Sequence, residues 1–101
     1  MVLRTIERLV RGLAPERIVL FGSYAKGRQR AGSDVDLLLI GPFDARAAHA
    51  QRRARQLAAS CFPPIDIVLA TPQEVADAPR AKSPFLHSIL GTGVTVYTRD
   101  A

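Results

Sequence analysis

The chain has 101 residues, of which 48% are hydrophobic and 23% charged, the balance of one small globular domain. Its formal net charge of +5 suits phosphates, but no groove-reading motif or row of aromatic residues accompanies it, so we do not expect direct binding of nucleic acid. No apolar stretch approaches the roughly 20 residues of a membrane helix, and no signal peptide is visible. A single cysteine, Cys61, cannot form an internal disulfide, so a cytoplasmic protein is the simplest expectation.

The chain is expected to open with a helix and a strand. Apolar residues in the range 2–13 recur at helical spacing with arginines on another face, which predicts an amphipathic helix. The apolar run RIVLF (17–21) is typical of a buried strand. Turn formers occupy both ends of segment 22–33, which leaves room for about one or two helical turns between them. The run DVDLLLI (34–40) predicts a second strand, which a Gly-Pro pair stops.

A second long helix is expected after this strand. Asp44 suits its N-cap, small and apolar residues recur at three- and four-residue spacing as far as Cys61, and two prolines then end it. The arginines of this helix take other faces, which indicates a solvated surface. The run IDIVLA (65–70) predicts a third strand.

The last third of the chain predicts two short helices and a final strand. TPQEVADA (71–78) begins with a threonine N-cap and a proline at the first helical position, and SPFLHSIL (83–90) repeats the pattern with serine and proline. The segment from Gly91 to Gly93 is expected to break the chain before the strand VTVYT (94–98). Alternating helices and strands indicate an α/β sheet with helices packed against it.

Two aspartates, Asp34 and Asp36, stand one residue apart at the start of an apolar strand. Side chains alternate along a strand, so both face one way, with alpha carbons about 7 Å apart. Like charges this close favour a shared cation, and magnesium takes such oxygen ligands. Asp66 starts the next apolar strand and can join the pair if the two strands are neighbours. As alternatives, Asp34 could cap a turn and Asp66 could accept bonds from backbone donors.

Several residues that precede these aspartates in the chain suit the binding of a phosphate group. Gly22 follows the first strand and lets a ligand approach the backbone closely, while Ser23 opens a segment whose free N–H groups can bind an anion. Lys26, Arg28 and Arg30 lie within reach of the same turn. A Gly-Ser pair alone is usually an ordinary turn and cap, but ten residues before Asp-x-Asp it becomes a strong signal.

The pattern of Gly-Ser, ten residues and Asp-x-Asp resembles the signature of the DNA polymerase β-like nucleotidyltransferases. GSYAKG and SDVDLLL look most like the minimal nucleotidyltransferase group of that superfamily, and the resemblance covers nearly the whole chain. It implies an α/β (α+β) fold, a single nucleotidyltransferase domain over residues 1–101, with a mixed β-sheet of about four strands and flanking helices.

The same resemblance implies how the site residues divide their work. Gly22 and Ser23 would hold the triphosphate of ATP, and Asp34, Asp36 and Asp66 would bind two magnesium ions. Asp66 would help to remove the proton of the attacking hydroxyl. Lys26 or Arg28 would supply the positive charge that stabilises the leaving pyrophosphate. Lys26 stands where many relatives have arginine, which keeps the charge but loses the planar fork.

Members of this group often act as antitoxins beside a helical ribonuclease toxin of the HEPN type, and some transfer AMP from ATP to a tyrosine of that toxin. We therefore expect a magnesium-dependent protein adenylyltransferase (AMPylation) that forms a hetero-oligomer with such a partner. Two alternatives stay open: a non-catalytic antitoxin that occludes its partner, and nucleotidyl transfer to a small molecule or an RNA end.

Other chemically capable residues are expected to pack or to face solvent. His49 and His87 lie within predicted helices and receive no chemical role, and Tyr97 is expected to pack. The apolar residues Phe85, Leu86 and Ile89 could meet a partner or close the core, and we favour the core.

Overall fold

The computed structural model describes residues 2–22, 35–43, 47–59, 65–78 and 84–99. These residues form, in chain order, α1 (Val2–Leu13), β1 (Arg17–Phe21), β2 (Val35–Ile40), α2 (Ala47–Ala58), β3 (Ile65–Ala70), α3 (Pro72–Asp77), α4 (Pro84–Thr92) and β4 (Val94–Thr98). The predicted mixed α and β architecture is confirmed. Asp44, Cys61 and the expected cap Ser83 lie outside the described residues.

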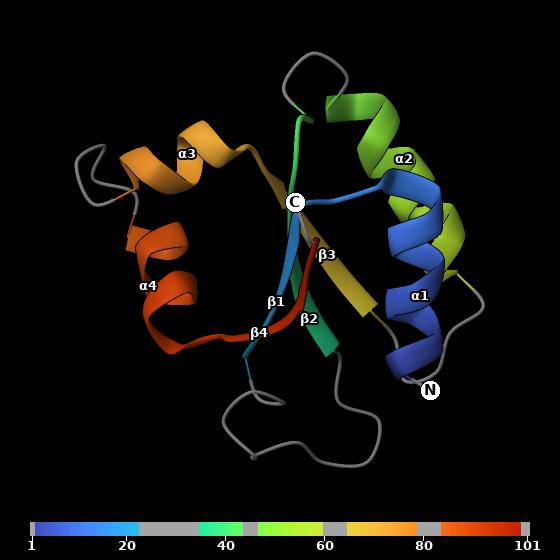
Figure 1. Cartoon of the computed structure of the whole chain (residues 1–101), viewed down its shortest axis with the longest axis horizontal. Coiled ribbons are helices and arrows are strands. Elements are labelled where there is room, and N and C mark those ends of the chain that lie inside the picture. The colour runs from blue at the N-terminus through green and yellow to red at the C-terminus, as the bar shows by residue number, and fades with distance from the viewer. Residues whose placement is uncertain (1, 23–34, 44–46, 60–64, 79–83, 100–101) are drawn as a thin grey trace.

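The four strands form one mixed sheet in the order β3-β2-β1-β4. β1 runs antiparallel to both β2 and β4, whereas β2 and β3 run parallel. A parallel pair needs a long crossover, and α2 lies in the connection between these two strands. In Figure 1, α1 and α2 lie on one side of the sheet, and α3 and α4 lie on the other.

β2 is buried on both faces, which explains its almost continuous apolar sequence. Its residues Val35, Leu37 and Leu39 belong to the core beneath α1 and α2, while Leu38 and Ile40 belong to the core beneath α3 and α4. Four of these five side chains are 0% exposed, so neither face can be exchanged for the other without a large loss of burial.

The two long helices bury the faces that their sequences predict. In α1, Ile6 and Leu9 are buried while Arg4 and Arg11 are exposed. α2 instead buries a stripe of small residues, which lets its backbone approach the sheet closely: Ala50, Ala54 and Ala58. The two helices also pack against each other, because Leu57 lies directly over Gly12 at the end of α1.

The start of α3 is a complete capping box. The Thr71 hydroxyl accepts a hydrogen bond from the Glu74 backbone N–H at 3.1 Å, and Glu74 Oε1 accepts one from the Thr71 N–H at 3.0 Å. Thr71 and Pro72 take their predicted positions. The sequence pattern above does not single out Glu74, although threonine followed three residues later by glutamate is the known signature of this motif.

α4 ends later than predicted. The expected break at Gly91 is wrong, because the helix continues through Gly91 to Thr92, whose hydroxyl donates to the Ser88 carbonyl at 2.8 Å. The helix stops at Gly93, where the backbone N–H donates to the Ile89 carbonyl at 2.7 Å. One glycine inside a helix costs too little to end it when the helix packs against the sheet.

The remaining expectations for individual side chains are largely met. His49 and His87 are exposed, and Tyr97 packs against the core beneath α1 and α2. Leu86 and Ile89 close the core beneath α4, as favoured, but Phe85 does not and stays largely exposed. Among the described residues, no helix has the length and apolar character needed to cross a bilayer.

The two glycines near the end of α4 should respond differently to alanine. A Cβ at Gly93 would lie 2.7 Å from the Ile89 carbonyl oxygen and 3.0 Å from that of Leu20, whereas one at Gly91 would meet nothing within 4 Å. We expect Gly93→Ala to lower the free energy of unfolding by about 1–3 kcal/mol. The matched control Gly91→Ala should be neutral, or stabilising by up to about 1 kcal/mol. Urea denaturation measures both, and equal midpoints for the two variants would contradict this packing.

Candidate functional site

Asp36 and Asp66 are brought side by side by the parallel pairing of β2 with β3. They are register partners, and partners on neighbouring strands are about 4.8 Å apart along the hydrogen-bonding direction. Both side chains belong to the α3 and α4 face, because residues two positions further along each strand, Leu38 and Val68, pack in that core. Asp36 is half-buried and Asp66 is exposed. The pair therefore has one sheltered carboxylate and one that faces solvent.

Gly22 lies against the Asp36 carboxylate. Phe21, the last residue of β1, is the register partner of Asp36, and Gly22 follows it with a φ of 76°. A Cβ added at Gly22 would collide with Asp36 Oδ2. Glycine is therefore required here for two reasons: the left-handed backbone and the close approach of the Asp36 carboxylate. The turn expected to bind phosphate begins beside one of the two carboxylates.

The other four candidate site residues cannot be placed in this arrangement. Ser23, Lys26, Arg28 and Asp34 lie outside the described residues, so their roles stay predictions. Among the residues that are described, no group of three or more His, Cys, Asp or Glu side chains could hold a metal ion. The described part of the site consists of the aspartate pair and the Gly22 backbone.

The aspartate pair fits a magnesium site in its ligand chemistry. Two carboxylates from adjacent strands supply the hard oxygen ligands that magnesium prefers. They share one face, and the exposure of Asp66 leaves that side open to water or a phosphate group. A bound divalent cation would also offset the repulsion between two negative charges on neighbouring strands.

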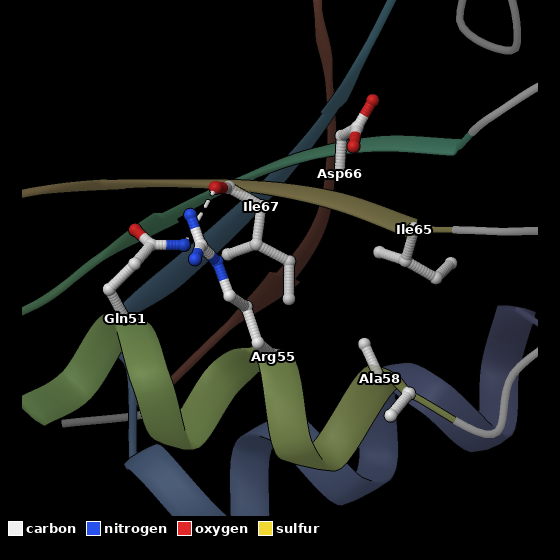
Figure 2. A pocket seen from close by; sticks show the side chains of 7 residues that line it. Gln51, Arg55, Ala58, Ile65, Asp66 and Ile67 are labelled. Carbon is white, nitrogen blue, oxygen red and sulfur yellow. Dashed lines mark hydrogen bonds between the residues drawn. The ribbon is translucent and has the colours of Figure 1, made fainter.

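A hollow lies on the other side of β3 from this pair. It has a volume of about 400 Å³ and is lined mainly by side chains of α2 and β3: Gln51, Arg55, Ala58, Ala59, Ile65 and Ile67. Asp66 also lines it, but Figure 2 shows the Asp66 carboxylate projecting away from α2, opposite to Ile65 and Ile67. The hollow and the carboxylates therefore belong to different faces of the sheet.

Gln51, which lines this hollow, has a structural role. Its Nε2 donates a hydrogen bond to the Ile67 carbonyl at 3.3 Å (Figure 2). β3 is an edge strand of the described sheet, so this bond satisfies part of an edge that would otherwise face solvent. The sequence carries no local signal for this contact, because the two residues belong to separate elements.

Phe21 is a neighbour of the site that the sequence pattern presents only as a buried strand residue. It is half-buried, precedes Gly22 and pairs with Asp36. Its ring contacts Phe85 of α4 edge to face, with 6.2 Å between ring centroids and an interplanar angle of 85°. In the sequence, the signal that could have marked Phe21 as a neighbour of the site is its position directly before the Gly-Ser pair.

Known proteins share this arrangement of elements. The family model described as the nucleotidyltransferase domain matches residues 2–89. A candidate nucleotidyltransferase from Sulfolobus solfataricus has a similar structure, with a TM-score of 0.65 and 15% identity over 97% of this chain and 78% of that one. A chain from the crystal structure of a toxin-antitoxin with AMP-PNP has a TM-score of 0.57 and 21% identity, over 99% and 76%. At these identities the two structures show a common fold, and no curated protein matches the sequence.

Substitution of Gly22 tests its contact with Asp36. Gly22→Ala should lose about 1–2 kcal/mol of stability from the left-handed backbone. The collision with the Asp36 carboxylate should add about 1–3 kcal/mol. In an Asp36→Ala background the collision disappears and the backbone cost remains. Gly22→Ala should therefore lose less stability in that background than in wild type.

Thermal or urea unfolding of the four proteins in this double-mutant cycle gives the coupling. Additive effects, with no smaller loss in the Asp36→Ala background, would contradict the close approach.

Proposed function

Because this chain belongs to the nucleotidyltransferase domain family, we propose that it is a magnesium-dependent enzyme that transfers AMP from ATP to a tyrosine of a helical HEPN-type toxin. The transfer would make it an antitoxin. The observation that carries the chemical part of the proposal is the pairing of Asp36 with Asp66 beside Gly22. The toxin-antitoxin with AMP-PNP that shares this fold supports the choice of nucleotide and of partner.

The proposed reaction is a displacement at the α-phosphorus of ATP. The tyrosine oxygen forms a bond to phosphorus, the bond to the bridging oxygen of the β-phosphate breaks, and pyrophosphate leaves. Asp34, Asp36 and Asp66 would hold two magnesium ions, which when bound lower the pKa of the attacking hydroxyl and neutralise charge on the phosphates.

The protein's own groups would orient the reactants and move the proton. Asp66 is the exposed member of the pair, so an acceptor from another molecule can approach it, and its carboxylate would take the hydroxyl proton. The Gly22 backbone and Ser23 would hold the triphosphate, and Lys26 and Arg28 would offset the charge on the leaving pyrophosphate.

The partner would supply the acceptor in a hetero-oligomer. An acceptor on a second protein agrees with a carboxylate pair that is open on one side. A cytoplasmic location would supply the ATP that the proposed reaction consumes.

Loss of one carboxylate should abolish most transfer. We expect Asp36→Asn or Asp66→Asn to reduce label transfer from α-labelled ATP to the helical partner by about 100-fold or more, the scale of removing one preorganised electrostatic group. Asp77→Asn is the matched control, because Asp77 lies on α3 and accepts a hydrogen bond from Gln73, one turn earlier in the same helix, at 2.9 Å. Equal labelling of the partner by wild type and by Asp36→Asn would contradict a mechanism that depends on these carboxylates. Chelation of magnesium should reproduce the loss in wild type.

A second experiment separates modification from occlusion. The double variant Asp34→Asn, Asp36→Asn is mixed with the toxin in the presence of magnesium and ATP, and ribonuclease activity is followed. We expect the toxin to stay active with the variant and to lose activity with wild type, with a mass increase of one or more AMP groups. Inhibition by the variant without added mass would favour occlusion over transfer.

A further inference from the structure

The described residues carry one large aromatic side chain that the core does not use. Phe85 is 61% exposed, although Leu86 and Ile89 of the same helix are buried. Its exposed neighbours on α4 are Pro84, His87 and Ser88, and the two polar residues interrupt any apolar strip along the helix. A single exposed ring among polar residues fits a small flat ligand better than a broad protein interface.

Phe85 lies on the same side of the sheet as the aspartate pair. α4 packs on the face to which Asp36 and Asp66 belong, as its buried residues share a core with Leu38 of β2 and Val68 of β3. Figure 1 shows α4 on that side, opposite to α1 and α2. The next most exposed large apolar residue, Val94, pairs with Leu20, which packs in the opposite core.

A single ring connects Phe85 to the carboxylates. Phe85 meets Phe21 edge to face at 6.2 Å, and Phe21 is the register partner of Asp36, with alpha carbons about 4.5–5.5 Å apart in such a pair. The contact fixes one side of the Phe85 ring and leaves the rest exposed. If the phosphates of a nucleotide lie at Gly22 and the carboxylates, its base needs a surface a short way from them, and Phe85 is such a surface.

We propose that Phe85, held in place by Phe21, is the platform on which the base of the bound nucleotide stacks. The inference rests on the proposed function, because it assumes that the triphosphate lies beside Gly22 and Asp36. Stacking on one aromatic ring needs no hydrogen bonds to the base edge, so Phe85 contributes affinity for a nucleoside triphosphate rather than strict choice of base. The ring is a binding residue and takes no part in the chemical step.

The test compares a ligand that has a base with one that lacks it. Isothermal titration with magnesium measures the affinity of wild type and Phe85→Ala for a non-hydrolysable ATP analogue and for inorganic tripolyphosphate. We expect Phe85→Ala to weaken the analogue by roughly 5- to 150-fold, the range that stacking of one base is worth, and to change tripolyphosphate less than about twofold. Phe85→Leu keeps an apolar side chain without the ring and should also weaken only the analogue.

Val94→Ala is the matched control. It removes another exposed apolar side chain, on the other face of the sheet, and should alter neither affinity. Urea midpoints of the Phe85 variants, which should stay close to wild type for so exposed a residue, establish that they remain folded.

A tryptophan at the same place gives an independent optical signal. The chain has no tryptophan, so Phe85→Trp introduces a single emitter. Stacking predicts that the ATP analogue quenches its fluorescence and that tripolyphosphate does not.

The possible results separate this inference from the proposed function. Unchanged affinity of Phe85→Ala for the analogue overturns the platform, as does an equal loss for both ligands. A variant that binds the analogue normally but no longer binds the toxin also overturns it and assigns the ring to the partner. If wild type binds neither ligand with magnesium present, the proposed function fails and the platform fails with it.

Discussion

The parallel register between β2 and β3 is the constraint on which the candidate site depends. It sets Asp36 beside Asp66 and directs both toward one face of the sheet. Because side chains alternate along a strand, a slip of one residue would turn Asp66 to the other face and bring Ile67 or Ile65 in its place. The site therefore exists only in one register.

The hydrophobic core enforces that register. β2 is central and buried on both faces, so Leu37 and Leu38 must each point into the correct layer. A slip of β3 would expose residues that pack beneath α2 and would turn Asp66 into the core without a partner. An uncompensated buried charge costs about 3–5 kcal/mol, a large share of a typical domain's stability. The apolar ends of these strands thus hold the charged ends in place, and stability and chemistry share the same two strands.

The two faces of the sheet carry different tasks. On one face, α1 and α2 cover the strands, and the hollow beside β3 is bordered by a glutamine that satisfies a backbone carbonyl. On the other, α4 leaves Phe85 exposed on the side where the carboxylates lie. On the carboxylate face the core gathers around Leu38 and Ile40 of β2 and Val68 and Ala70 of β3, further along both strands, so Asp66 at the start of β3 stays exposed.

The helices, the strands, the Thr71 cap and the family resemblance follow from the sequence alone, because periodicity, turn formers and motif spacing are local properties of the chain. The family match confirms that resemblance. The end of α4 is an exception, since packing against the sheet carries the helix past Gly91. Three features required the tertiary structure: the pairing of β2 with β3, the contact of Gly22 with Asp36, and the place of Phe85 against Phe21. Each joins residues far apart in the chain, and no local pattern specifies which strands become neighbours or which apolar side chain the core leaves out.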